Sequence, residues 1–184
     1  MNPLLDFAGL PRFDEIKPEH VAPAVDELLA AGRAAVAAAV HARPTWDEFV
    51  APLEDANERL GRAWGQVAHL HAVMDNPALR EAYNAALPKV SQYWTELGQN
   101  LRLFQKYKEL ARSAEFAGLS PARKKIVDNA LRDFRLGGAA LSDGDKARFK
   151  AVQEALSSAS AKFRDNLLDS ENAWAHYVAN ETDL

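Results

Sequence analysis

The segment Ser120–Gly138, SPARKKIVDNALRDFRLGG, carries the clearest secondary-structure signal in this chain. It predicts one helix, with Ser120 as the N-cap, Pro121 at the first helical position and the paired glycines as the stop. Apolar residues at helical spacing predict a buried stripe, namely Ile126, Val127, Ala130, Leu131 and Phe134. On the opposite face Asp128 and Arg132 stand four apart, with the acid first, which predicts a helix ion pair.

The same helical periodicity extends along the rest of the chain, and no segment shows the two-residue alternation of a strand. Local signals mark further helix starts: Pro18, the Thr45–Glu48 capping box, and the Asn76-Pro77 pair. The expected helices run from Pro18 to about His41, from Thr45 to before Asn76, from Pro77 through Tyr107, over the Ser120 segment, and from Ser142 almost to the end.

Two of these helices carry long apolar stripes. In the third helix the stripe is Leu79, Tyr83, Leu87, Val90, Trp94, Leu97, Leu101, Phe104 and Tyr107, and Pro88 should kink the helix. In the fifth helix the stripe is Phe149, Val152, Leu156, Ala159, Phe163, Leu167, Trp174 and Val178. Both stripes predict faces that are buried against neighbouring helices.

These signals predict an all-α fold, a bundle of long antiparallel helices with a kinked third helix and an irregular N-terminal arm. The arm extends to Lys17. Its expected anchors on the body are Leu4, Leu5, Phe7, Leu10 and Phe13. No repeat or linker divides the chain, so residues 1–184 are expected to form a single helical domain.

Composition narrows the possible partners. Of the 184 residues 48% are hydrophobic and 26% charged, as in folded soluble proteins. A net charge of -4 argues against nucleic-acid binding. The densest basic run, Arg123-Lys124-Lys125, is expected to be a solvated helix end, with anion binding as the alternative.

The cellular location is predicted from three features that the sequence lacks: cysteines, a secretory signal and a membrane-spanning segment. Without cysteine there can be no disulfide or thiolate metal ligand, which is compatible with a reducing compartment. The start has no secretory pattern, and the longest small-apolar run, Ala34 to Val40, is much shorter than the ~20 residues of a membrane span. We therefore expect a cytoplasmic protein with no membrane contact.

The side chains suggest no catalytic, cofactor-binding or metal-binding residue. Among the five histidines none has a histidine partner at the four-residue spacing of a helical zinc site, and none follows a glutamate by three positions. The four tryptophans, Trp46, Trp64, Trp94 and Trp174, are expected to pack in the core rather than to form a binding platform. Nucleophile elbows and phosphate-binding glycine loops are also missing.

Four phrases resemble the N-terminal region of the thimet-oligopeptidase-like family of zinc metallopeptidases. They are Asn2-Pro3-Leu4-Leu5, Ile16 to Ala24, Leu79 to Tyr83, and Asp128 to Phe134 followed by Leu136 and Gly138. The resemblance covers the chain nearly end to end. Gly137 and Ala139 depart from the bulkier or more polar types expected there.

The resemblance implies the N-terminal domain of a longer peptidase that hydrolyses short peptides. In that family zinc is held by a His-Glu-x-x-His helix and a further glutamate. No residue of this chain matches them, so the resemblance implies zinc in the parent protein and none here, and an inactive isolated domain. It also implies a helical wall over a deep channel, with the C-terminal catalytic half and short peptides as partners. Two alternatives are a stand-alone helical interaction module and a small helical enzyme built from scattered carboxylates.

Overall fold

The computed structural model describes residues 2–180 and 182, and over this part of the chain it contains helices and no strand. The α-helices are α1 (Pro18–His41), α2 (Ala51–Val73), α3 (Pro77–Gly98), α4 (Leu101–Ala111), α5 (Ala114–Gly118), α6 (Pro121–Leu136) and α7 (Asp143–Ala173). Three short turns complete the order: η1 (Pro3–Leu5), η2 (Phe13–Glu15) and η3 (Trp46–Val50), the last of π type. The predicted all-α class is confirmed. In the described residues no helix is both long enough and apolar enough to span a membrane.

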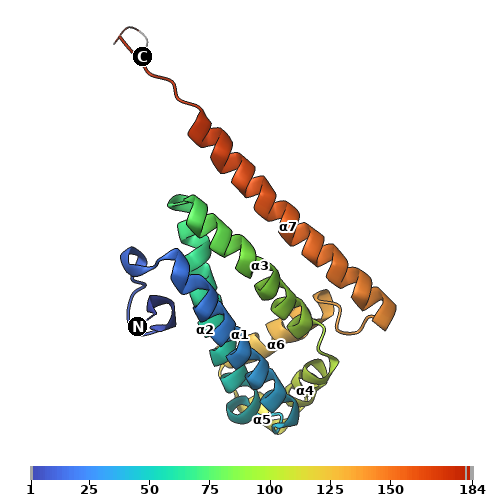
Figure 1. Cartoon of the computed structure of the whole chain (residues 1–184). Helices are drawn as coiled ribbons and strands as arrows, with labels where there is room; N and C mark the ends of the chain where they lie inside the picture. Colours follow the sequence, from blue (N-terminus) through green and yellow to red (C-terminus); the bar gives the residue numbers. More distant parts are fainter. Residues whose placement is uncertain (1, 181, 183–184) are drawn as a thin grey trace.

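Helices α1, α2 and α3 run antiparallel in succession and enclose the first of two cores (Figure 1). Its fully buried members include Leu4, Val21, Val25, Leu60, Val67, Tyr83, Val90 and Tyr93. Helices α1 and α3 approach each other closely at Gly32, where an added Cβ would lie 2.6 Å from the Tyr93 hydroxyl. Helix α1 begins at Pro18 and ends at His41, as the sequence predicts.

The second core joins η3 and the start of α2 to α4 and α6. Its buried side chains include Trp46, Phe49, Leu53, Leu103, Tyr107, Val127 and Phe134. Helix α6 has the predicted Ser120 cap, and Gly138 adopts a φ of 84° just beyond its end. Two details of the prediction were wrong: Ile126 is exposed, and Arg132 pairs with Asp133 at 2.8 Å rather than with Asp128.

The expected third helix is two helices. Helix α3 ends at Gly98, and Asn100 caps α4 by accepting a hydrogen bond from the Leu103 amide at 3.1 Å. The C-cap residue of α6, Gly137, lies close to the backbone at this break. A Cβ on Gly137 would lie 3.0 Å from the Gly98 carbonyl oxygen. The prediction of one helix through Tyr107 was therefore wrong. Helix α3 continues through Pro88, where a kink remains a prediction.

The N-terminal arm is irregular as predicted, with η1 and η2 as its only helical turns in the described residues. Asn2 fastens it by donating to the His20 carbonyl at 2.8 Å, and Leu4 is fully buried. Leu10 is 90% exposed, so its predicted anchoring was wrong.

Helix α7 contradicts its predicted burial. It runs antiparallel to α3 and extends past the end of the helical body (Figure 1). Only Ala161 among its residues is buried. The expected core positions Val152, Leu156, Phe163 and Leu167 are all exposed, and Trp174 lies exposed beyond the helix end. The separate prediction that the four tryptophans pack in the core was therefore wrong for Trp174. Trp94 is more than one-third exposed.

Candidate functional site

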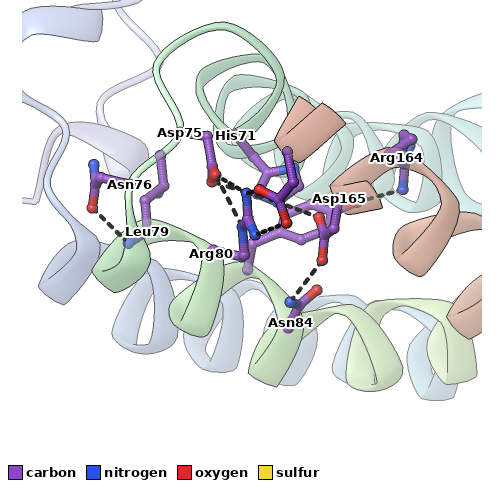
Figure 2. A network of polar contacts seen from close by, with 10 residues as sticks. His71, Asp75, Asn76, Leu79, Arg80, Asn84, Arg164 and Asp165 are labelled. Carbon is purple, nitrogen blue, oxygen red and sulfur yellow. Dashed lines mark hydrogen bonds and ion pairs between the residues drawn. The ribbon is translucent and has the colours of Figure 1, made fainter. Parts of the chain in front are cut away.

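A polar cluster joins the end of α2 and the start of α3 to α7 (Figure 2). We call it the clasp; its residues are His71, Asp75, Arg80, Tyr83, Asn84, Arg164, Asp165 and Asp169. At its centre His71 is 2% exposed and stacks on Tyr83, with ring centres 4.2 Å apart and planes within 13°. Tyr83 stacks in turn on Trp64 at 4.8 Å. This aromatic stack fixes the position of the His71 ring.

Two carboxylates face the buried imidazole of His71. Its Nε2 atom lies 3.2 Å from Asp165 Oδ1 and 3.8 Å from Asp75 Oδ1. These three atoms are buried and lie outside hydrogen-bonding geometry. An imidazolium at His71 would place a positive charge between two negative ones, so the arrangement is suited to an ion pair between α2 and α7.

Arg80 provides the second link across the clasp. Its Nη2 contacts Asp75 Oδ2 at 2.5 Å and Asp169 Oδ1 at 2.7 Å, and its Nη1 contacts Asp169 Oδ2 at 3.0 Å. The paired bonds to Asp169 form the bidentate geometry that a guanidinium and a carboxylate favour. Hydrogen bonding to Arg80 lowers the pKa of Asp169, and the two carboxylates raise the pKa of Arg80.

Two further bonds complete the clasp. Arg164 Nη2 donates to the Tyr83 hydroxyl at 2.9 Å, and Asn84 Nδ2 donates to Asp165 Oδ2 at 3.4 Å. Burial raises the pKa of Tyr83, so its hydroxyl stays protonated and accepts from Arg164 through a lone pair. All of these contacts attach α7 to the body through polar side chains.

The clasp does not fit a zinc site. Its one imidazole shares Asp75 with the guanidinium of Arg80, and a cation beside Arg80 would be repelled. Across residues 2–180 and 182, no group of three or more His, Asp or Glu side chains has an arrangement that could hold a metal ion.

A second feature is a cleft of about 520 Å³ between α2, α3, α4 and α6. Glu54 accepts a hydrogen bond from the Tyr107 hydroxyl at 3.2 Å, and Tyr93 donates to Asn57 at 2.6 Å. Burial raises the pKa of Glu54 and raises that of Tyr93 to about 12. Glu58, Asp133, Trp94, Leu97 and Phe134 also line the cleft. Carboxylates beside apolar side chains can bind a ligand, but the residues that line the cleft include no activated nucleophile.

Sequence reasoning proposed no site residue and missed the clasp. The search covered histidine pairs and Glu-x-x-His spacing, whereas the available signal was His71 near the end of α2 and Asp75, four residues later in the loop that follows it. Two other histidines have contacts outside the clasp: His20 Nδ1 accepts from the Lys17 amide at 3.1 Å, and the His69 ring centre lies 5.3 Å from that of Phe13.

The basic run at the start of α6 is held by its neighbours. The Arg123 guanidinium lies 4.7 Å from the ring centre of Trp46, and Lys124 Nζ donates to the Ala117 carbonyl at 2.7 Å. These contacts fit the expected helix end better than an anion site.

The fold and surfaces define an all-helical domain with one polar clasp and one acidic, apolar cleft. The pattern described as neurolysin/thimet oligopeptidase, N-terminal domain, matches residues 25–146, and the chain belongs to this family. It is 42% identical to oligopeptidase A of Haemophilus influenzae, 41% to that of Salmonella typhimurium and 40% to that of Escherichia coli. Each match covers 100% of this chain and 27% of the relative. The chain thus spans about a quarter of the length of these curated relatives and corresponds to their N-terminal domain.

Proposed function

We propose that this chain is the N-terminal domain of a zinc-dependent oligopeptidase and forms one wall of a channel that admits short peptides. The end-to-end match to a quarter of three proteins named oligopeptidase A carries the proposal. In this proposal residues 1–184 act as one domain in the cytoplasm. The C-terminal catalytic half holds the zinc, and the domain itself contributes no catalytic residue.

Two properties of the domain support a role as a wall. Helices α1, α2 and α3 are each more than twenty residues long and share one closely packed core, which makes a rigid barrier. The Glu54 cleft adds carboxylates beside Trp94 and Phe134, a surface that can contact a peptide backbone or a basic side chain. A rigid wall would exclude folded proteins by size, whatever their sequence.

Activity and metal binding of the isolated chain test the proposal. We expect residues 1–184 to leave a quenched fluorescent nonapeptide intact and to bind no equimolar zinc by calorimetry. Joined to the unmatched three quarters of Haemophilus influenzae oligopeptidase A, the chain should support cleavage of that peptide but not of a folded protein. Hydrolysis by pure residues 1–184, or a joined protein that cuts folded substrates equally fast, would contradict the proposal.

The stand-alone interaction module remains an alternative. The whole-chain match to part of longer peptidases does not favour it. It predicts that the joined protein gains nothing from the presence of residues 1–184.

A further inference from the structure

Helix α7 presents chemically different surfaces on its two sides. Toward α3 it presents Ala161, which is buried, and the clasp residues Arg164 and Asp165. Successive residues of an α-helix are rotated by about 100°, so Phe163 points roughly 160° away from Ala161. Phe163 therefore points away from the body of the domain, and Val152, Leu156 and Leu167 are exposed as well.

These side chains form one continuous surface, which we call the α7 stripe: Val152, Leu156, Phe163 and Leu167. By the same rotation they lie within about 60° of one another around the helix. Phe163 is 68% exposed and Leu156 is 56% exposed. Helix α7 has 31 residues, so the stripe lies on a rod about 46 Å long.

This arrangement is the reverse of an ordinary surface helix, which buries its apolar stripe and exposes its polar face. Here the polar face holds the helix to its own domain, and the apolar face is left open. An exposed apolar surface of this kind marks an interaction site.

Helix α7 lies where the N-terminal domain pattern ends and the longer peptidase continues. The family pattern for the N-terminal domain ends at residue 146, near the start of α7. The match to oligopeptidase A continues across α7 to the end of the chain, and 73% of that relative (100% less the 27% matched) lies outside it. Helix α7 after its first turn thus lies beyond the N-terminal domain pattern but within the peptidase match.

We infer that the α7 stripe is the docking surface for the part of an oligopeptidase-length chain that follows the N-terminal domain. The clasp fixes α7 to the N-terminal side, and the stripe packs against apolar side chains of the catalytic side. Helix α7 is then the shared element between the two halves. This inference rests on the proposed function and adds the surface by which the halves meet.

Cysteine labelling tests the inference, because residues 1–184 contain no cysteine. Phe163→Cys and Leu156→Cys place a thiol in the stripe, and Leu10→Cys places one at an exposed apolar position on the arm. Each variant is made in residues 1–184 alone and in the joined protein with the remainder of Haemophilus influenzae oligopeptidase A. Maleimide labelling rates are assigned to each site by peptide mapping.

In the isolated chain all three thiols should react at similar rates. In the joined protein the Phe163→Cys and Leu156→Cys thiols should react at least roughly tenfold more slowly, while Leu10→Cys keeps its rate. Equal rates for the stripe thiols in both proteins would overturn the inference, whether or not the joined protein is active. Stripe thiols already slow in the isolated chain, with sedimentation as a dimer, would also overturn it and assign the stripe to a second copy.

The two proposals fail in different ways. A joined protein that protects the stripe but does not cleave peptides contradicts the proposed function and leaves the docking surface supported. A joined protein that cleaves peptides with an unprotected stripe contradicts only the docking surface.

Discussion

Arg80 of α3 and Asp169 of α7, 89 residues apart in the sequence, form a bidentate ion pair with N–O distances of 2.7 and 3.0 Å. The same guanidinium holds Asp75 at 2.5 Å, whose side chain is almost buried. Arg80 thus connects three segments of the chain. It holds a helix that otherwise has little apolar contact with the body.

Replacing Arg80 should therefore loosen α7. Arg80→Met keeps most of the side-chain volume but leaves the Asp75 carboxylate without its guanidinium, so it should lower the unfolding free energy. Urea unfolding measures this loss, and hydrogen exchange should quicken mainly in α7. The control is Arg33→Met, which breaks the exposed Arg33–Glu96 pair and should cost less than about 0.5 kcal/mol. Equal losses in the two variants would contradict the importance of the clasp.

Acid should weaken the link to α7 at Asp169. Arg80 lowers the pKa of this carboxyl below its ordinary 3.8, so the ion pair contributes fully above that value. The contribution is lost as pH falls through the lowered folded-state pKa. Asp169→Asn should thus reduce exchange protection in α7 at pH 7, and this difference should shrink as pH falls below 3.8. A difference that persists undiminished in acid would show that the charge of Asp169 is not what holds the helix.

The Glu54 carboxyl should have the opposite pH dependence. Burial raises its pKa above the ordinary 4.5, so the folded state binds more protons than the unfolded state between the two pKa values. Stability therefore falls as pH rises through that window. Glu54→Gln can still accept from Tyr107, and it should raise the unfolding free energy at pH 7 by less than about 1 kcal/mol, because solvent partly screens the charge.

Chemical unfolding at pH 4 and pH 7 checks this expectation, since the gain should be present only at pH 7. Glu58→Gln changes an exposed carboxyl of the same cleft and is the matched control, expected to have little effect at either pH. A Glu54→Gln variant less stable than the parent at pH 7 would contradict the sign.

The close contact between α1 and α3 should make Gly32 intolerant of substitution. In Gly32→Ala the new Cβ would lie 2.6 Å from the Tyr93 hydroxyl and 2.9 Å from its ring carbon, while Tyr93 is fully enclosed. We expect a loss of about 1–3 kcal/mol from overpacking, despite a gain of about 1 kcal/mol in helix propensity.

Two glycines of α2 offer a control within the same protein. A Cβ on Gly61 or Gly65 meets nothing within 4 Å, so alanine there should stabilise the helix by about 0.5–1 kcal/mol. Thermal unfolding distinguishes the two groups by the sign of the shift in Tm. A stabilising Gly32→Ala substitution would contradict the packing described for Tyr93.

Local sequence signals predicted the helix starts well. Pro18, Thr45, Asn76, Ser120 and Ser142 each stand where a helical segment begins, and four of them accept a hydrogen bond from the first turn. Capping depends on a side chain and an amide two or three residues away, so it can be read from sequence. The clasp could be seen only in part: His71 and Asp75 are four residues apart in the sequence, whereas Asp165 and Asp169 reach them only through the packing of α7 on α3.

Local residue patterns are enough to show that this protein is helical, where most helices begin, and that α7 carries an apolar stripe, because these properties depend on residues within one or two turns. The tertiary structure decided which stripes are covered. Tyr83 and Val90 of α3 are enclosed in the core with α1 and α2, but Phe163 and Leu156 stay exposed because the clasp turns the polar side of α7 toward the body. Periodicity shows that a helix has an apolar face, and only the position of its partners shows whether that face meets the same domain or another.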